Sequence, residues 1–324
     1  MIKNKEQVWL YVLIMVIGYL LGYISIWFGI SKKINFKKPN IRIIKKHLLP
    51  CAIMLIPVLA LSIYRSMDKV MLGAMTNMTE TGIYENGEKL IYCLSSLISS
   101  LGTVMMPKIS YLVEIKNEKK INDYILKSLK FMMIMTSAMT FGLMSISNGI
   151  VPIIFGRKFL DSTSVLFFCS PILIFMGWSN VFRTQYIIPH KLDSIYVKSI
   201  TYGSIINLIS NIICIPKYGA IGAVIGTLIA ELFVPAYQYL KLRNKIQYSL
   251  YIKQVIAYPI IGLLMLILLK SVEKLLGTSL YVLIVQMILG AIIYLALTYL
   301  YIKFKDEQLY KYIMNILKLK KVKK

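Results

Sequence analysis

Nine predominantly apolar stretches follow one another along the chain, and each is long enough to cross a bilayer as a helix. A helix needs roughly 20 mostly apolar residues to span the hydrocarbon core. The stretches predict spans at 8–30, 48–72, 84–112, 131–150, 164–188, 198–215, 218–240, 255–270 and 280–302. Hydrophobic residues make up 57% of the 324 positions, more than in a typical soluble domain. The pattern predicts an all-α integral membrane protein with about nine transmembrane helices.

Lysine and arginine are concentrated in every second connection between the predicted spans. The connection 31–47 carries seven of them and no acid, and further basic groups lie around 108–130, 241–253 and 303–324. Cytoplasmic loops of membrane proteins carry an excess of these residues. We therefore expect a multi-pass protein of the bacterial cytoplasmic membrane, with its amino terminus outside and its carboxyl terminus in the cytoplasm. The net charge of +24 then reflects contact with anionic membrane lipids, and no nucleic-acid partner is expected.

Other chemistries have little support in the sequence. The four cysteines lie singly within predicted spans, so neither a disulfide framework nor a metal cluster is expected. No glycine-rich phosphate loop is present, which argues against direct use of ATP. In the tail 303–324, apolar residues share one helical face before a lysine-rich end, which fits either a surface-lying helix or a frayed basic tail. These features favour a transporter without a bound cofactor over an enzyme.

Ionisable side chains within the membrane are costly and are therefore functional candidates. Two clusters lie near the outer side, on helices joined by a short turn. Each cluster occupies positions i, i+3 and i+4, which places its members on one helix face. The members are Arg65, Asp68 and Lys69 at the end of the second span, and Glu85, Glu88 and Lys89 at the start of the third.

Two interpretations of these clusters remain open. Their three positive and three negative charges could form a neutral network that holds two helices together. Alternatively, the cations face a central cavity and meet an anionic substrate, with Asp68 or Glu88 as a proton-titratable partner. A network that opens during transport would combine both roles.

Two further charges and a stripe of small residues lie in later spans. Glu231 precedes Pro235, which is expected to kink its helix, and could bind a coupling ion or bond to a neighbouring helix. Arg183 lies near the inner end of its span and could either extend to the cytoplasmic headgroups or line a cavity. Gly222 and Gly226 repeat at four-residue spacing, continued by Ala230, which predicts close helix packing.

Four motifs occur in a familiar order and spacing. They are Arg65-Ser-Met-Asp-Lys-Val-Met-Leu-Gly73, Thr81-Gly-Ile-Tyr84 followed by Lys89, Met106-Pro-Lys-Ile-Ser110, and Pro216-Lys-Tyr-Gly-Ala-Ile-Gly-Ala-Val-Ile-Gly-Thr227 followed by Glu231. The series resembles the bacterial polysaccharide repeat-unit flippases (Wzx-type) of the multidrug/oligosaccharidyl-lipid/polysaccharide exporter superfamily. The resemblance covers roughly residues 48–240.

The resemblance implies a MATE-like fold of fourteen spans, with two six-helix lobes around a cavity and a final helix pair. Residues 1–30 would match the last span of the amino-terminal lobe, and 31–47 a basic cytoplasmic linker. Residues 48–240 would form the carboxyl-terminal lobe, 241–302 the terminal helix pair, and 303–324 a cytoplasmic tail. We therefore expect most of the amino-terminal lobe to be absent, as in a truncated product or one half of a split transporter.

The function implied by the resemblance is flipping of undecaprenyl-pyrophosphate-linked oligosaccharide repeat units for surface polysaccharides such as O-antigen or capsule. Arg65, Lys69 and Lys89 would contact the anionic head, and an H⁺ or Na⁺ gradient would drive transport. Expected partners are the lipid-linked oligosaccharide, membrane lipids, other polysaccharide-assembly proteins and a separate amino-terminal lobe. The alternatives are a multidrug antiporter of the same superfamily, a membrane-embedded polymerase or acyltransferase, and a nonfunctional remnant.

Overall fold

The chain forms two compact units, 1–61 and 62–324, each of which is described by itself. The structure is a computed structural model. It describes residues 8–30, 41, 45–46, 48, 66–243, 245–246, 248–307, 309–311 and 314.

The first unit contains α1 (Val8–Ile30), which coincides with the first predicted span. At about 1.5 Å per residue, its 23 residues reach about 34 Å, enough to cross the hydrocarbon core. Its described side chains are almost all exposed and apolar. Most of the predicted linker 31–47 and most of the second predicted span lie outside the described residues.

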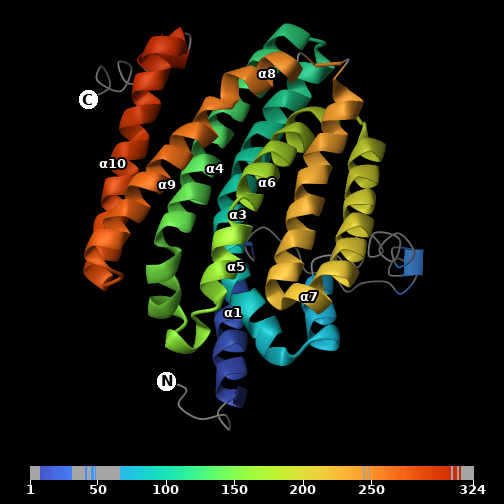
Figure 1. The fold of residues 1–324 in the computed structure, drawn as a ribbon. Helices are drawn as coiled ribbons and strands as arrows, with labels where there is room; N and C mark the ends of the chain where they lie inside the picture. Colours follow the sequence, from blue (N-terminus) through green and yellow to red (C-terminus); the bar gives the residue numbers. More distant parts are fainter. Residues whose placement is uncertain are drawn as a thin grey trace. The chain divides into compact units, whose positions relative to one another are not determined.

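The second unit is a bundle of long helices joined by short turns (Figure 1). Residues 66–75 are helical and complete the second predicted span. The elements that follow are α3 (Met78–Glu114), α4 (Glu118–Ile154), η3 (Arg157–Phe159), α5 (Ser162–Cys169), α6 (Ile172–Phe182), η4 (Arg183–Ile187), α7 (Asp193–Leu242), α8 (Tyr248–Val255), α9 (Ala257–Leu276) and α10 (Leu280–Lys305).

Capping residues determine where several of these helices begin. The side chain of Asn77 accepts a hydrogen bond from the backbone N–H of Glu80 at the start of α3, and Asn117 caps α4 in the same way. Ser279 caps α10. Pro171 separates α5 from α6, and together with η4 these two helices make up the predicted span 164–188.

The α7 element is a hairpin of two antiparallel legs. Its 50 residues would reach about 75 Å as one helix, more than twice the hydrocarbon thickness. The backbone leaves helical geometry at Gly219, where φ is 54°. The backbone of Gly222 packs against that of Cys214, and Gly203 faces Val234, as antiparallel legs require. The legs lie side by side in Figure 1 and correspond to the predicted spans 198–215 and 218–240.

The chain is a multi-pass membrane protein. Among the described residues, six helical segments are long and apolar enough to cross a membrane. They are Met78–Glu114, Glu118–Ile154, Ser162–Ile187, Asp193–Leu242, Ile252–Leu276 and Leu280–Lys305. Because Asp193–Leu242 is a hairpin, these segments supply seven of the predicted crossings. Within the described part of the chain all the regular structure is helical, which confirms the all-α prediction.

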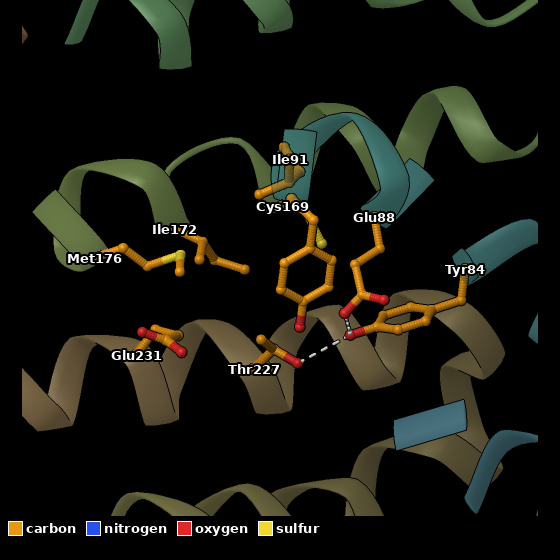
Figure 2. Close-up of a pocket in the computed structure, with 9 residues that line it drawn as sticks. Tyr84, Glu88, Ile91, Cys169, Ile172, Met176, Thr227 and Glu231 are labelled. Atoms are coloured by element: carbon orange, nitrogen blue, oxygen red, sulfur yellow. Dashed lines mark hydrogen bonds between the residues drawn. The ribbon is translucent and has the colours of Figure 1, made fainter. Parts of the chain in front are cut away.

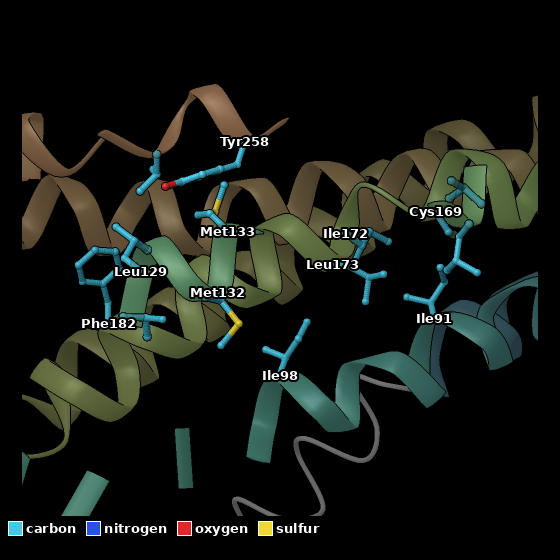
Figure 3. Packing of buried hydrophobic residues seen from close by; sticks show 14 of the residues in the cluster. Ile91, Ile98, Leu129, Met132, Met133, Cys169, Ile172, Leu173, Phe182 and Tyr258 are labelled. Atoms are coloured by element: carbon cyan, nitrogen blue, oxygen red, sulfur yellow. The ribbon is translucent and has the colours of Figure 1, made fainter. Parts of the chain in front are cut away.

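The helix α4 forms the centre of the second unit and contacts α3, α5, α6, α9 and α10. Figure 3 shows the apolar core, in which Met132 and Met133 of α4 lie among Ile98 of α3 and Leu173 of α6. The α9–α10 pair packs on α4 around a second, smaller apolar cluster that includes Met265. A buried ion pair between Lys130 of α4 and Asp306, at the end of α10, ties this pair to the bundle.

The basic connections gather at one end of the second unit. In Figure 1 the carboxyl-terminal ends of α3, α7 and α10 and the start of α8 lie at the top, whereas the turn between the legs of α7 and the α9–α10 turn lie at the bottom. Helices that alternate in direction place every second connection on the same side. The charge alternation in the sequence therefore corresponds to the two ends of the bundle.

Candidate functional site

Polar side chains from four helical segments meet inside the second unit. Asp68 comes from the helix 66–75, Tyr84 and Glu88 from α3, Asn211 from the first leg of α7, and Thr227 from its second leg. Asp68 and Glu88 are each only 6% exposed. Burying carboxyl groups is costly unless they are hydrogen-bonded, so this cluster is a functional candidate.

Asp68 lies at the centre of the cluster. Its Oδ2 accepts hydrogen bonds from Tyr84 Oη at 3.0 Å and from Thr227 Oγ1 at 2.9 Å, and its Oδ1 accepts one from Asn211 Nδ2 at 2.6 Å. Asn211 Nδ2 also lies 3.2 Å from Asn207 Oδ1. The carboxylate of Asp68 thereby links both legs of α7 to α3.

Glu88 lies one helical turn after Tyr84 and pairs with a cation. Its Oε2 is 3.0 Å from Lys69 Nζ, and its Oε1 accepts a longer hydrogen bond of 3.4 Å from Tyr84 Oη. The Glu88 side chain is 8% exposed and that of Lys69 is 32% exposed. The Lys69 ammonium group is therefore engaged by a buried carboxylate.

A small, partly open pocket adjoins this cluster (Figure 2). Its walls combine polar groups with apolar side chains from α3, α5, α6 and the second leg of α7. The lining residues are Tyr84, Glu88, Ile91, Tyr92, Cys169, Ile172, Met176, Thr227 and Glu231. In Figure 2, Glu231 lies on the same helix as Thr227, on the Met176 side of the pocket.

Small residues allow the two legs of α7 to bring their polar groups together. A Cβ atom at Gly226 would lie 2.1 Å from Asn211 Oδ1, and one at Gly222 would lie 2.3 Å from the carbonyl oxygen of Cys214. Both distances are far below van der Waals contact. The predicted close packing of this stripe is confirmed, and at Gly226 it leaves the space that Asn211 occupies.

The turn between the legs is held by a carboxylate from α3. Glu80 Oε2 accepts a hydrogen bond of 2.7 Å from the backbone N–H of Ala220, the first residue after Gly219. A carboxylate at a helix amino terminus satisfies a free N–H group and interacts favourably with the helix dipole. Glu80 thus sets the position of the leg that carries Thr227 and Glu231.

The structure separates the charges that the sequence analysis placed together. Lys89 is paired with Glu85 at 3.4 Å, and both side chains are close to half exposed, outside the buried cluster. Arg183 donates a hydrogen bond of 3.0 Å to Tyr196 Oη and is not among the residues that line the pocket. Arg65 lies outside the described residues.

Several residues of the site were missed as candidates. Tyr84 and Thr227 were part of the motifs but were given no role. Asn207 and Asn211 are amides at i, i+4 spacing inside an apolar span, and this pattern was a usable signal because buried polar groups in a membrane need partners. Glu80 gave no such signal, because its partner is a backbone N–H group far away in the sequence.

Several side-chain oxygen atoms gather in the described cluster. Asp68, Asn207, Asn211 and Thr227 offer oxygen atoms, the ligands that hard cations prefer. Asn211 Oδ1 is buried and accepts no hydrogen bond within the described residues. Three carboxyl groups, those of Asp68, Glu88 and Glu231, lie in or beside the pocket together with one ammonium group, that of Lys69. The local charge therefore favours a proton or a small cation over a phosphate.

Comparisons with known proteins agree with this architecture. The family described as "Polysaccharide biosynthesis protein" matches residues 3–164, half of the chain. The chain is 22% identical over 169 residues to a Haloferax volcanii protein named "Probable low-salt glycan biosynthesis flippase Agl15", covering 51% of this chain and 34% of that protein. It is 24% identical over 208 residues to an uncharacterized membrane protein of Methanocaldococcus jannaschii, covering 62% of this chain and 40% of that protein.

Among solved structures, the fold is similar to that of the lipid II flippase MurJ in an inward closed conformation. The TM-score is 0.68 at 20% sequence identity, and the match covers 89% of this chain and 61% of MurJ. The chain thus spans less than half the length of the two curated relatives and about three fifths of this structural relative.

Proposed function

The chain belongs to the polysaccharide biosynthesis protein family, and on that premise we propose that it acts in a flippase that moves a lipid-linked glycan across the membrane. The observation that carries this proposal is a buried polar cluster that joins four helical segments in a fold similar to that of a lipid II flippase. Sugars and phosphates cannot cross hydrocarbon without a polar route. A transporter, and not an enzyme, is the activity that this arrangement supports.

The substrate class is the finer part of the proposal. We propose an undecaprenyl-pyrophosphate-linked oligosaccharide repeat unit that is used for a surface polysaccharide. The chain would lie in the bacterial cytoplasmic membrane, with its amino terminus outside and its carboxyl terminus in the cytoplasm. The gathering of basic connections at one end of the second unit supports this orientation, because such residues are retained on the cytoplasmic side.

Transport would be driven by an H⁺ or Na⁺ gradient through the cluster around Asp68. The oxygen atoms of Asp68, Asn207, Asn211 and Thr227 would hold the cation, and Glu88 and Glu231 are further carboxyl groups at the adjoining pocket. Because Asp68 touches both legs of α7 and α3, a change in its charge would alter contacts among all of them. Cation binding and helix rearrangement would be coupled in this way.

We propose that a complete transport cavity also needs an amino-terminal lobe, carried by the same or a separate polypeptide. The partial coverage of MurJ supports this proposal. Residues 48–240 would then act as the carboxyl-terminal lobe and 241–302 as the terminal helix pair. In cells that lack their own flippase, co-expression with a matching amino-terminal lobe is expected to restore surface polysaccharide, and full restoration by this chain alone would contradict the proposal.

A reconstituted assay tests both the flipping and its coupling. Vesicles that contain this chain together with a matching amino-terminal lobe and a fluorescent polyprenyl-pyrophosphate oligosaccharide report flipping through chemical quenching of the outer leaflet. We expect flipping to accelerate under an inward or outward gradient of Na⁺ or H⁺, and Asp68→Asn to remove this acceleration. Asp123→Asn is the control, since Asp123 forms an exposed pair with Lys127. Unchanged coupling in Asp68→Asn would refute the role of the cluster.

A further inference from the structure

The membrane span Ser162–Ile187 is interrupted twice, and α6 lies between the two interruptions. At the first, Pro171 has no backbone N–H group and separates α5 from α6. At the second, η4 is a π-helix, and the N–H group of Ile188 donates to the carbonyl oxygen of Arg183, five residues earlier, at 3.0 Å. We call these the first and the second joint. The 11 residues of α6 form a helical segment of about 16 Å between them.

The first joint lies at the wall of the pocket. The carbonyl oxygen of Ser170 accepts a hydrogen bond of 3.1 Å from Thr140 Oγ1 of α4, so this turn is held by a neighbouring helix. Cys169, just before the turn, and Ile172, just after it, both line the pocket beside the polar cluster (Figure 2). The start of α6 is therefore part of the pocket, and its other end is the second joint.

The second joint encloses amide groups that have no partner. Gln185 is 0% exposed, and neither its Nε2 nor its Oε1 makes a hydrogen bond within the described residues. Asn180 Oδ1 is also buried and accepts no hydrogen bond there. The joint is tightly packed against α3, because a Cβ atom at Gly102 would lie 2.5 Å from Asn180 Oδ1 and 2.9 Å from Thr184 Cγ2. These amides are thus shut in without hydrogen bonds.

Two other buried glutamines of the second unit show the usual arrangement. Gln238 Nε2 donates to the hydroxyl groups of Ser179 and Ser199, at 3.1 and 3.4 Å. Gln286 Nε2 donates to a backbone carbonyl oxygen at 3.2 Å. A buried polar group without a partner raises the free energy of the state that contains it, and folded proteins keep few such groups. The unpaired amide of Gln185 therefore points to a second arrangement of this segment, in which it has partners.

We propose that α6 is a lever between the pocket and the connection 188–192, and that η4 is a joint that rewinds during transport. This inference rests on the proposed function and adds the part that moves. A π-helix accommodates an extra residue in its turn. A shift of that residue along the helix would turn the side chains it passes by about 100° about the axis, the rotation of one α-helical residue. Such a turn would carry the Gln185 amide out of its present apolar surroundings.

The unpaired amide keeps two arrangements close in free energy. A ligand shifts a conformational equilibrium only by the difference between its affinities for the two states, so a modest bias is effective only when the states are nearly balanced. A cation bound at the Asp68 cluster would apply this bias at the first joint, which adjoins the same pocket. The lever would transmit it to η4, on the far side of α6.

Thermal unfolding tests whether Gln185 opposes the described arrangement. Gln185→Leu removes both unpaired groups and keeps a side chain of similar size. In the full chain, followed by circular dichroism in detergent, we expect its melting temperature to rise by roughly 2–8 °C. Gln238→Leu is the matched control and should lower the melting temperature, because it leaves the Ser179 and Ser199 hydroxyls without this partner.

Gln185→Met is a second variant, whose flexible side chain fits the site if the branched leucine does not. Melting temperatures of both variants at or below the native value would overturn the inference. They would mean that the Gln185 amide is satisfied in the native protein, as by a buried water molecule.

Hydrogen exchange followed by mass spectrometry tests the movement itself. Backbone amides exchange when their segment opens locally, so a variant that stabilises the described arrangement slows exchange at the joint. We expect Gln185→Leu to slow the exchange of 183–192 roughly tenfold and to leave that of α10 unchanged. Equal exchange at the joint in the native chain and the variant would refute the rearrangement. This measurement does not require flipping.

Flipping in vesicles that also contain the matching amino-terminal lobe tests what the movement serves. Gln185→Leu is expected to flip the fluorescent polyprenyl-pyrophosphate oligosaccharide about tenfold more slowly although it is more stable, because one arrangement is now favoured. Asp123→Asn is again the control. A more stable Gln185→Leu protein that flips at the native rate would refute the role of the joint in transport. Absence of flipping in the native protein would contradict the proposed function and leave the exchange result intact.

Discussion

The substitution Gly219→Ala is expected to destabilise the hairpin that brings Thr227 to the site. Gly219 has a φ of 54° and a ψ of −129°, a conformation that L residues rarely adopt. An added Cβ atom would also lie 2.5 Å from Glu80 Oε2. The carboxylate would have to move, and its hydrogen bond to the Ala220 N–H group would be lost.

The expected cost follows from these two effects. A non-glycine residue in a sparsely populated backbone region costs about 1–3 kcal/mol. Loss of a hydrogen bond to a charged group costs about 1.5–3 kcal/mol, with the lower end appropriate for the partly exposed Glu80. Together they predict a loss of roughly 2.5–4.5 kcal/mol in the free energy of unfolding.

Thermal unfolding of the purified protein in detergent, followed by circular dichroism, measures this loss. Gly277→Ala is the matched control, because Gly277 also has a positive φ, of 77°, but no atom within 4 Å of an added Cβ. It should show the backbone cost alone. Glu80→Ala should show the loss of the hydrogen bond alone.

The double variant Glu80→Ala with Gly219→Ala decides whether the two residues act together. Because Gly219→Ala already displaces the carboxylate, the removal of Glu80 from that background should cost much less than its removal from the native protein. Strictly additive effects, or a Gly219→Ala protein that unfolds at the native temperature, would refute this account of the turn.

Two further predictions concern close contacts elsewhere in the second unit. Gly226→Ala is expected to push Asn211 away from Asp68, since an added Cβ would lie 2.1 Å from Asn211 Oδ1. Cation-driven flipping in vesicles should therefore fall. Gly82→Ala is the control and should leave flipping unchanged, because an added Cβ there has no atom within 4 Å. Lys130→Met should destabilise the protein by about 3 kcal/mol, the low end for a buried pair, because the largely buried Asp306 carboxylate loses its cation but keeps the hydrogen bond from the Leu309 N–H group. A second change, Asp306→Leu, should restore much of the melting temperature, and equal instability of the single and double variants would contradict the role of the ion pair.

The helical, membrane-spanning architecture could be predicted from the sequence because lipid imposes a local requirement. A segment that crosses hydrocarbon must satisfy its own backbone hydrogen bonds and must be apolar over about 20 residues. The predicted span 8–30 coincides with α1, and the two predicted spans 198–215 and 218–240 are the legs of α7. Most of the second span, and with it Arg65, lies outside the described residues.

The candidate site was predicted only in part, since pairing depends on which helix faces meet. Asp68, Lys69 and Glu88 do form a cluster. Helical spacing alone could not separate Glu88, buried against Lys69, from its neighbour Lys89, which is exposed and paired with Glu85. Nor could it bring Asn211 or Thr227 to Asp68, because these residues are far apart in the sequence.

The sequence by itself thus determined the class of protein, the position of most helices along the chain and the presence of charge within the membrane. These properties depend on composition and on the cost of placing polar groups in lipid. Each segment must satisfy that requirement by itself, independently of its neighbours in the fold. Only the tertiary structure decided which carboxylates share the site and that Glu80 caps the second leg of α7. Those features depend on the rotation of each helix about its axis, which is set by the neighbours against which it packs.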